Sequence, residues 1–212
     1  MSAYNVPMPP PSAHALFLSQ EAILDAARTL FLGRGYEGVS MDDLAALAGV
    51  ARRTLYNQFG GKERIFRAML ARQWAVLAAG QDDGGVPLPT REDPALPLRA
   101  LARTLASRLA KGDQVALVRM VIAESRRQPE IAEDYARLGR QPLLARVRDC
   151  LTHLAMAGLI TCPDADLAAQ QFLGLLAEPL HWPRVLASGG GQADPARVAD
   201  EAVALFWARH GR

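Results

Sequence analysis

The sequence is poor in cysteine and in lysine. Its 212 residues include only two cysteines, Cys150 and Cys162, which excludes a disulfide-rich scaffold and a zinc site built from several thiolates. Only Lys62 and Lys111 among the 24 basic residues are lysines, so the other 22 are arginines. A genome rich in G and C produces such a bias, and we give it no functional weight. Because the net charge is only +2, any contact with nucleic acid must come from a local basic patch.

The sequence also lacks a long hydrophobic run. The longest apolar-rich stretch between charged residues, Cys150–Pro163, has 14 residues, whereas a membrane-spanning helix needs about 18 or more. The first 20 residues contain Pro7 and Pro9–Pro11 but lack the basic start of a secretion signal. We therefore expect residues 1–15 to form a flexible arm, and the protein to be cytoplasmic with no membrane partner.

Hydrophobic residues recur at helical spacing along the chain. They make up 50% of it, which is enough for a sizeable core. In the first segment, a stripe typical of an amphipathic helix runs from Ile23 to Phe31 and ends before Gly33. No alternating pattern typical of strands competes with it. The sequence predicts an all-α protein of about nine helices, with a small three-helix domain over residues 16–65 and a larger helical body over residues 66–212.

Residues 35–66 carry the pattern of a helix-turn-helix. Ser40 with Asp43 three residues later is typical of a capped helix start, and Gly49 supplies the turn before a second short helix, Ala51–Gln58. The second helix of such a motif enters the major groove of DNA. Arginine reads guanine edges, Asn and Gln read adenine edges, and hydroxyls suit phosphates. The residues expected to contact DNA are Ser40, Arg52, Arg53, Thr54, Tyr56, Asn57, Gln58 and Lys62.

The positive charge is concentrated in the same segment. Residues 50–72 hold six basic side chains and one acidic side chain, whereas residues 81–212 hold 16 of each sign. Lys62 stands at the start of the helix Lys62–Ala79, where backbone N–H groups also attract phosphate. This local excess of charge supports an interface with the phosphate backbone.

The segment Gln20–Ile65 resembles the DNA-binding domain of the TetR family of bacterial repressors. The positions that carry the resemblance are Phe31, Gly35-Tyr36, Ser40, Ala45, Ala48-Gly49-Val50, Thr54-Leu55-Tyr56, Phe59 and Lys62-Glu63. Gly61 departs from the pattern, because the family more often has a polar helix cap there. The later run Val121–Ile131 resembles the AefR-like subgroup of C-terminal domains.

The resemblance implies a homodimeric transcriptional regulator, usually a repressor, that binds a palindromic operator in double-stranded DNA. It also implies that a small molecule binds the helical body and releases the protein from DNA. Two alternatives stay open. The protein could be a constitutive DNA-binding regulator without an effector, or an all-α binding protein or enzyme whose basic helix is merely solvated.

The helical body offers candidates for an effector pocket. The segment Val115–Arg127 is apolar on several faces and predicts a buried central helix, yet it contains Glu124, whose carboxylate needs a partner such as Arg119 or a ligand. Large or adaptable side chains suit a small, mostly apolar or aromatic effector. The candidate pocket residues are Trp74, Met120, Glu124, His153, Met156 and Trp182. The same residues could equally fill the core.

The last two helices are the expected dimer surface. We predict them over Asp164–Ala187 and Pro195–Arg209, joined by a glycine-rich connector at residues 188–192. They carry more apolar area than one helix side needs. The residues expected at the interface are Phe172, Leu176, Phe206 and Trp207.

No catalytic or metal site is expected. Cys150 and His153 are one helical turn apart, but no orienting acid or oxyanion-hole motif accompanies them. His153 and His181 lack the carboxylate spacing of a metal site. The run Gly189–Gly191 lacks the Lys-Ser/Thr of a phosphate loop and is interpreted as a linker. We expect no enzyme activity, no metal and no cofactor.

Overall fold

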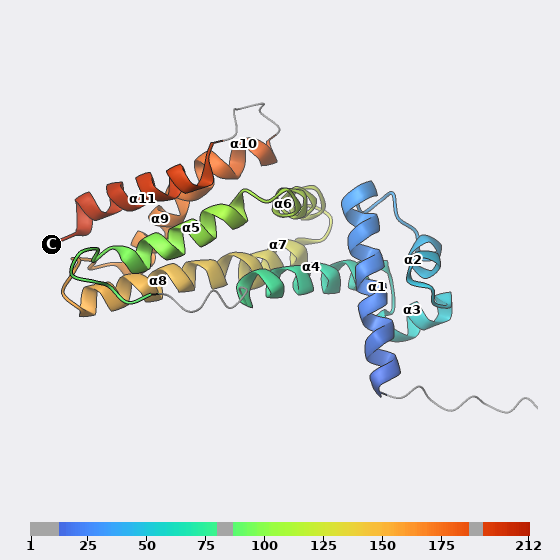
Figure 1. Ribbon diagram of the computed structural model, residues 1–212. Coiled ribbons are helices and arrows are strands. Elements are labelled where there is room, and N and C mark those ends of the chain that lie inside the picture. Colours follow the sequence, from blue (N-terminus) through green and yellow to red (C-terminus); the bar gives the residue numbers. More distant parts are fainter. Residues whose placement is uncertain (1–12, 80–86, 187–192) are drawn as a thin grey trace, which may run out of the picture. The chain divides into compact units, whose positions relative to one another are not determined.

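The computed structural model describes residues 13–79, 87–186 and 193–212, and these residues are helical apart from their connections (Figure 1). Within these ranges the only β pairing is an isolated bridge between Ile160 and Gly211. The all-α prediction is confirmed. The elements are α1 (Ala13–Arg34), α2 (Met41–Ala48), α3 (Arg52–Phe59), α4 (Lys62–Ala79), α5 (Leu96–Leu109), α6 (Gly112–Glu124), α7 (Pro129–Asp134), the π-helical η1 (Tyr135–Arg140), α8 (Gln141–Met156), α9 (Ala165–Leu180), α10 (Trp182–Val185) and α11 (Pro195–His210).

The chain divides into two compact units, one that reaches Met69 and one that begins at Leu70. The division falls inside α4, four residues later than the sequence predicted. The first turns of α4 belong to the first unit because Phe66 is fully buried against Phe31, with ring centroids 5.0 Å apart, and against Tyr36, with centroids 4.9 Å apart. Helix α4 therefore contributes side chains to both units.

Helix α1 begins at Ala13, within the segment 1–15 that was predicted to be a flexible arm. Ser19 is an interior helical residue, and its hydroxyl accepts a hydrogen bond from Gln58 Nε2 of α3 at 3.0 Å. Residues 13–15 are thus helical rather than part of an arm. The remainder of the predicted arm, residues 1–12, lies outside the described residues.

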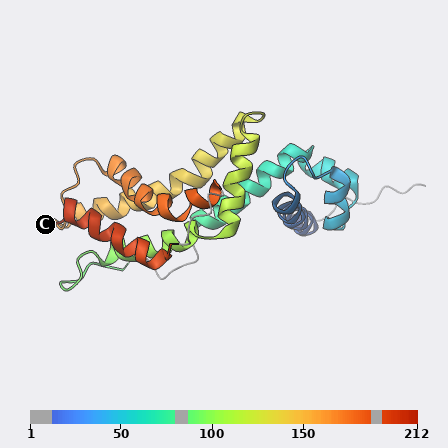
Figure 2. The same cartoon turned by 90° about the horizontal axis from the view of Figure 1, so that it is seen from above.

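The second unit is built around α5, α8, α9 and α11, which lie lengthwise against one another (Figures 1 and 2). Their buried faces form one core that includes Leu105 of α5, Leu151 of α8, Phe172 of α9 and Phe206 of α11. The rings of Phe172 and Phe206 meet edge to face, with centroids 5.4 Å apart. This packing fixes the four helices as one bundle.

The packing contradicts part of the predicted dimer surface. Phe172 and Leu176 are 0% exposed and Phe206 is 4% exposed, all within the core of a single protomer. Trp207 is partly buried against the same core. These helices carry excess apolar area because each packs on several neighbours, so Phe172, Leu176 and Phe206 cannot form an exposed interface.

The segment from Pro129 to Met156 is one continuous helical run. Helix α7 passes into η1 and then into α8 without a break. A π-helical turn inside an α-helix shifts the direction of the side chains that follow it, and such turns recur at functional sites. Here the turn contains Tyr135, Gly139 and Arg140.

The remaining helices differ less from expectation. Helix α9 continues through Pro179 and ends at Leu180, and α10 begins at Trp182, so the single helix predicted over Asp164–Ala187 is divided into two. Helix α6 is not buried on all sides, because Ile122 is half exposed. The glycine-rich connector at residues 188–192, with its run Gly189–Gly191, lies outside the described residues. Across the part of the chain that the structure describes, no helix is both long and apolar enough to cross a membrane.

Candidate functional site

The start of α2 is fixed by its own side chains. Ser40 is the N-cap: its hydroxyl accepts the Asp43 backbone N–H at 3.1 Å, and the Ser40 backbone N–H donates to Asp43 Oδ2 at 2.9 Å. The Ser40 hydroxyl also donates to Asp43 Oδ2, which is the main reason that the pKa of Asp43 lies below its ordinary value. The Ser40 hydroxyl therefore serves the fold, and its predicted contact with DNA stays a prediction.

The turn between α2 and α3 depends on Gly49. Its φ of 66° lies in the left-handed region, where a side chain would strain the backbone. The Val50 N–H then donates to the Ala45 carbonyl at 3.1 Å. Leu55 of α3 and Leu44 of α2 are both fully buried. Burial of these two leucines fixes the inner face of α3 in the core of the first unit, so the opposite face of α3 is exposed.

The outward face of α3 presents Arg52, Arg53, Tyr56 and Asn57, which are all exposed. Arg52 Nη1 lies 3.0 Å from Asp42 Oδ1 of α2, and its Nη2 donates to the Tyr56 hydroxyl at 3.4 Å. These contacts raise the pKa of Arg52, with the Tyr56 hydroxyl as the largest cause. The pair with Asp42 is exposed and therefore weak, so Arg52 can exchange this partner for a base or a phosphate.

Two predicted contacts do not share this outward face. Gln58 is half-buried, and its amide binds Ser19 of α1 instead of facing outward. In this conformation the Gln58 amide is bound inside the first unit, and its predicted contact with DNA stays a prediction. Thr54 is also half-buried. Thr54 and Gln58 lie one helical turn apart, on a side of α3 that is turned away from the exposed stripe. Leu55, next to Thr54, packs in the core and fixes which side of α3 faces inward.

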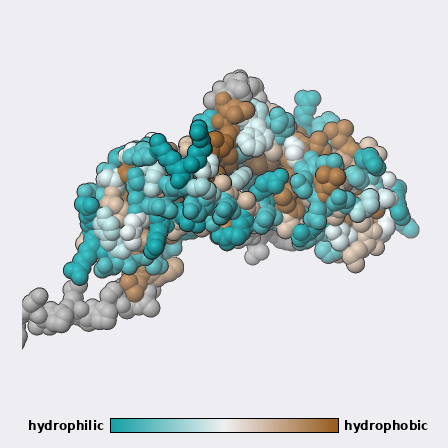
Figure 3. Space-filling model, turned by 180° about the vertical axis from the view of Figure 1, so that it is seen from behind, coloured by the Kyte–Doolittle hydropathy of each residue, from teal (hydrophilic) through white to brown (hydrophobic). Residues whose placement is uncertain are grey.

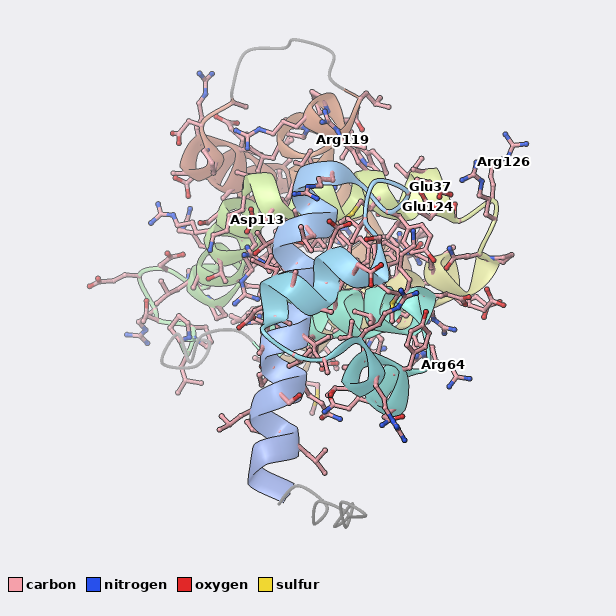
Figure 4. All side chains as sticks on the ribbon, turned by 90° about the vertical axis from the view of Figure 1, so that its right-hand side faces the viewer. Glu37, Arg64, Asp113, Arg119, Glu124 and Arg126 are labelled. Atoms are coloured by element: carbon pink, nitrogen blue, oxygen red, sulfur yellow. The ribbon has the colours of Figure 1, made fainter. Side chains whose placement is uncertain are left out.

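Lys62 is engaged inside the first unit. Its ammonium group donates to the backbone carbonyls of Tyr36 and Val39, both at 3.0 Å, and lies 4.3 Å from the centroid of the Tyr36 ring. Two of its three N–H donors are thus occupied. Lys62 fixes the connection between α1 and α2. By contrast, Arg64 is exposed on the first turns of α4 (Figure 4) and is a better candidate for phosphate contact, which the sequence analysis missed.

We expect Lys62→Met to lower the free energy of unfolding by about 1–3 kcal/mol, because the apolar stem is kept while two charge-assisted hydrogen bonds are lost. Urea unfolding measures this change. Arg64→Met is the matched control: it should change stability by less than about 0.5 kcal/mol and should flatten the salt dependence of DNA binding. Unchanged stability of Lys62→Met, together with a flatter salt slope, would instead assign Lys62 to phosphate binding.

The second unit contains a partly open cavity of about 180 Å³. Three aromatic side chains line it: Trp74 of α4, Tyr135 of η1 and Trp182 of α10. The Trp74 and Tyr135 rings lie with centroids 5.7 Å apart. Gln114, Gln170, Arg140 and His181 supply polar groups, and Leu109, Val118, Gly139, Leu143, Leu173, Gly174 and Ala177 complete the walls.

The protonation state of His181 decides which hydrogen bonds the cavity offers. Burial lowers the pKa of His181 below its ordinary value, which favours the neutral ring. Its Nδ1 lies 3.4 Å from the carbonyl of Leu109, which can only accept, so Nδ1 carries the proton. Nε2 is then an acceptor. Burial also raises the pKa of Tyr135, which stays a neutral phenol.

The structure brings together two of the six predicted pocket residues. Trp74 and Trp182 line the cavity, whereas Met120 and Glu124 do not. His153 lines a separate hollow on α8, and Met156 is 81% exposed at the end of that helix. Sequence periodicity could not assign these residues, because the cavity is assembled from four separate stretches of the chain, at residues 74, 109–118, 135–143 and 170–182.

Glu124 does not receive the predicted partner. Its side chain is buried, and its Oε2 has no hydrogen-bond partner within the described residues. Arg119 donates instead to the backbone carbonyls of Val185, at 2.9 Å, and Arg184, so its side chain reaches α10 from α6 (Figure 4). Arg119 thereby ties α6 to the short helix that carries Trp182.

A groove lies between α9 and α11 on the surface of the second unit. Seen from behind, the hydrophilic surface of the protein is interrupted by hydrophobic areas (Figure 3). Leu175 and Leu205 line it and are 38% and 60% exposed. Arg197 and Glu201 lie along the same groove. These exposed leucines, rather than the buried phenylalanines, are the large apolar side chains that α9 and α11 offer in this groove.

A capped helix-turn-helix with an exposed basic helix defines a class of proteins that read DNA. The profile described as "Bacterial regulatory proteins, tetR family" matches residues 23–69. The profile of the AefR-like transcriptional repressor C-terminal domain matches residues 97–212, more than half of the chain. The chain belongs to the TetR family of DNA-binding transcriptional regulators.

Relatives agree with this assignment. The chain is 45% identical over 60 residues to the transcriptional repressor ComR of Escherichia coli and 34% identical over 55 residues to the regulator AlkX of Mycobacterium tuberculosis. These alignments cover 28% and 26% of this chain, and 29% and 26% of the relatives, so the chain matches less than a third of each relative's length.

Solved structures match over the whole fold. A TetR-family regulator from Mesorhizobium loti superimposes with a TM-score of 0.81 and 28% identity, over 93% of this chain and 98% of that one. The flavonoid-responsive regulator FrrA matches with a TM-score of 0.74 and 25% identity, over 91% of this chain and 97% of that one.

Proposed function

We propose that the protein is a repressor that binds a palindromic operator as a homodimer and leaves it when a small aromatic compound binds the second unit. The observation that carries the proposal is the lined cavity in the body of a protein whose first unit presents a DNA-reading helix. A cavity with several aromatic walls and a few polar groups is typical of a small-molecule site. It favours a ligand-responsive regulator over a constitutive one.

The DNA contacts are assigned to the outward face of α3. Arg52, Arg53, Tyr56 and Asn57 are exposed there without a buried role. Arg and Asn make paired hydrogen bonds to guanine and adenine edges in the major groove, and Tyr56 and Arg64 suit phosphates. A dimer would place two such helices about 34 Å apart, on successive turns of the operator.

The dimer surface is assigned to the groove between α9 and α11. Leu175 and Leu205 give it an apolar centre, while Arg197 and Glu201 give it charges of both signs. In a two-fold dimer the same patch faces itself, so an arginine of one copy can meet a glutamate of the other. Exposed leucines in such a groove are explained by a second copy of the chain.

The effector is assigned by the chemistry of the cavity. A volume of about 180 Å³ is close to that of engineered cavities that hold a single benzene ring. Trp74, Tyr135 and Trp182 suit a flat aromatic body, and the acceptor Nε2 of His181 suits a hydroxyl donor. A small phenol therefore fits best. The similar structure FrrA is a flavonoid-responsive regulator, which is in keeping with an aromatic effector.

We expect the ligand to release the protein from DNA by shifting the population between two conformations, with α4 as the helix that transmits the change. A ligand lowers operator affinity only as far as it prefers the conformation that binds DNA poorly. Helix α4 supplies Phe66 to the core of the first unit and Trp74 to the wall of the cavity. A ligand that moves Trp74 therefore acts on a helix that also anchors the DNA-binding unit.

Gly174 provides the test. It lines the cavity, and a Cβ added there would meet nothing within 4 Å. We expect Gly174→Phe to fill the cavity, so that 2-naphthol and other small phenols no longer raise the melting temperature or release the protein from its own promoter region in gel shifts. Gly174→Ala is the control: it should keep both responses and gain about 0.5–1 kcal/mol of helix stability.

Light scattering must show that the Gly174→Phe variant keeps the mass of the wild type. Release of this variant by the same phenols would place the effector elsewhere. If no compound in the panel changes operator binding of the wild type, the constitutive regulator becomes the better function. If the wild type does not bind DNA at all with a steep salt dependence, the repressor proposal fails.

A further inference from the structure

A second hollow lies against α5 and α8, beside the segment that precedes α5. Its volume is about 590 Å³, and its lining comes from α8, from the start of α5 and from the segment that precedes α5. The lining residues are Pro87, Leu88, Pro89, Pro97, Leu101, Arg146, Asp149, Cys150, His153, Leu154 and Ala157. None of them lines the aromatic cavity. The two sites are therefore separate.

The walls of this hollow are mostly hydrophobic. Leu101 and Leu154 form a buried floor, each 2% exposed, and Cys150 is buried beside them. Leu88 stands over the hollow with 83% of its surface exposed. An exposed leucine above a buried apolar floor leaves a space that an apolar chain can enter and from which it would displace water.

One polar group in the hollow lacks a partner. Arg146 supplies its only guanidinium, and Nη1 of Arg146 is buried without a hydrogen-bond acceptor among the described residues. Burying such a donor unpaired is costly. The acid beside it, Asp149, is already bound to Arg148, whose Nη2 donates to Asp149 Oδ1 at 3.2 Å. Although Asp149 also lines the hollow, the described residues leave this nitrogen of Arg146 without an anionic partner.

We propose that this hollow binds an amphipathic carboxylate, such as a fatty acid of medium length. The carboxylate pairs with the guanidinium of Arg146, and the acyl chain lies on Leu101 and Leu154 beneath Leu88. Arginine and a carboxylate match in charge and geometry, because the guanidinium can donate two parallel hydrogen bonds. A volume of about 590 Å³ falls in the range of ordinary ligand sites. This proposal does not depend on the phenol response.

Cys150 provides a reporter at the site. Burial raises the pKa of its thiol to about 11, so it reacts slowly at neutral pH, where little thiolate is present. Cys162 is half-buried, does not line the hollow, and can be followed in the same sample. Because Cys150 lines the hollow, a bound acyl chain should shield it further.

The experiment uses octanoate and 1-octanol, which share the chain but not the charge. Calorimetry on the full protein should show octanoate binding, with 1-octanol at least about tenfold weaker. Mass spectrometry at pH 9 should show that octanoate slows alkylation of Cys150 by N-ethylmaleimide while alkylation of Cys162 is unchanged. Arg146→Gln should weaken octanoate by at least about tenfold and should remove the protection of Cys150.

Arg140→Gln is the matched control, because Arg140 lies on the same helical run but lines the aromatic cavity. It should leave octanoate binding unchanged. Equal affinity for octanoate and 1-octanol, or equal affinity of the wild type and Arg146→Gln, would overturn the carboxylate assignment. If Arg140→Gln loses octanoate binding and Arg146→Gln keeps it, then octanoate binds in the aromatic cavity and the proposal of a second site is wrong.

Discussion

Phe172→Ala is expected to lower the free energy of unfolding by about 3–5 kcal/mol, the range for a buried phenylalanine cut to alanine. Its side chain is 0% exposed and packs edge to face on Phe206 inside the core of one protomer. The loss has two sources: the apolar area returned to water on unfolding, and the cavity left between α9 and α11. Urea unfolding, followed by circular dichroism, measures it.

Leu205→Glu is the matched comparison on α11, because Leu205 is 60% exposed and lines the surface groove. We expect this variant to keep its helical content and to become a monomer of half the dimer mass in light scattering. Either of two results would instead assign Phe172 to the dimer interface. One is a Phe172→Ala variant that is as stable as the wild type but monomeric. The other is a Leu205→Glu variant that is less stable but still dimeric.

Asn57→Ala is expected to weaken binding to the specific operator by about 1–3 kcal/mol, which corresponds to roughly five- to 150-fold in affinity. Asn57 is exposed on the outward face of α3. Binding to unrelated DNA should stay unchanged, because a lost base contact removes discrimination and not phosphate attraction. Gel shifts with specific and competitor DNA measure both affinities.

Gln58→Ala is the neighbouring control. Its amide is held by Ser19 of α1 rather than offered to DNA, so the change should cost about 1 kcal/mol of stability or less and should leave the specificity ratio intact. If Gln58→Ala loses operator discrimination and Asn57→Ala keeps it, then α3 is rotated in the complex relative to its position in this structure.

The helix-turn-helix could be predicted from the sequence because its determinants are local. The Ser40–Asp43 cap joins residues three apart, and the turn requires a left-handed residue at Gly49. Interactions between residues so close in the chain produce a fixed spacing of residue types that can be recognised in the sequence. The same spacing also places Leu55 in the core and Arg52, Arg53, Tyr56 and Asn57 outside it.

Gln58 and Lys62 show where this local reasoning ends. Their residue types and positions fit a contact with DNA, but both are bound within the first unit, Gln58 to Ser19 and Lys62 to the carbonyls of Tyr36 and Val39. These partners lie 23 to 39 residues away in the chain. No periodicity in the sequence encodes such a pairing.

By itself the sequence determined the all-α class, the helix-turn-helix and the family, since helical period, caps and glycine turns act between near neighbours. Only the tertiary structure decided what each apolar helix face contacts. It placed Phe172, Leu176 and Phe206 in a protomer core. It also built the aromatic cavity from Trp74, Tyr135 and Trp182, residues that share no stripe. Burial by long-range packing depends on how several helices meet, and a single helix's pattern of polar and apolar residues does not record its neighbours.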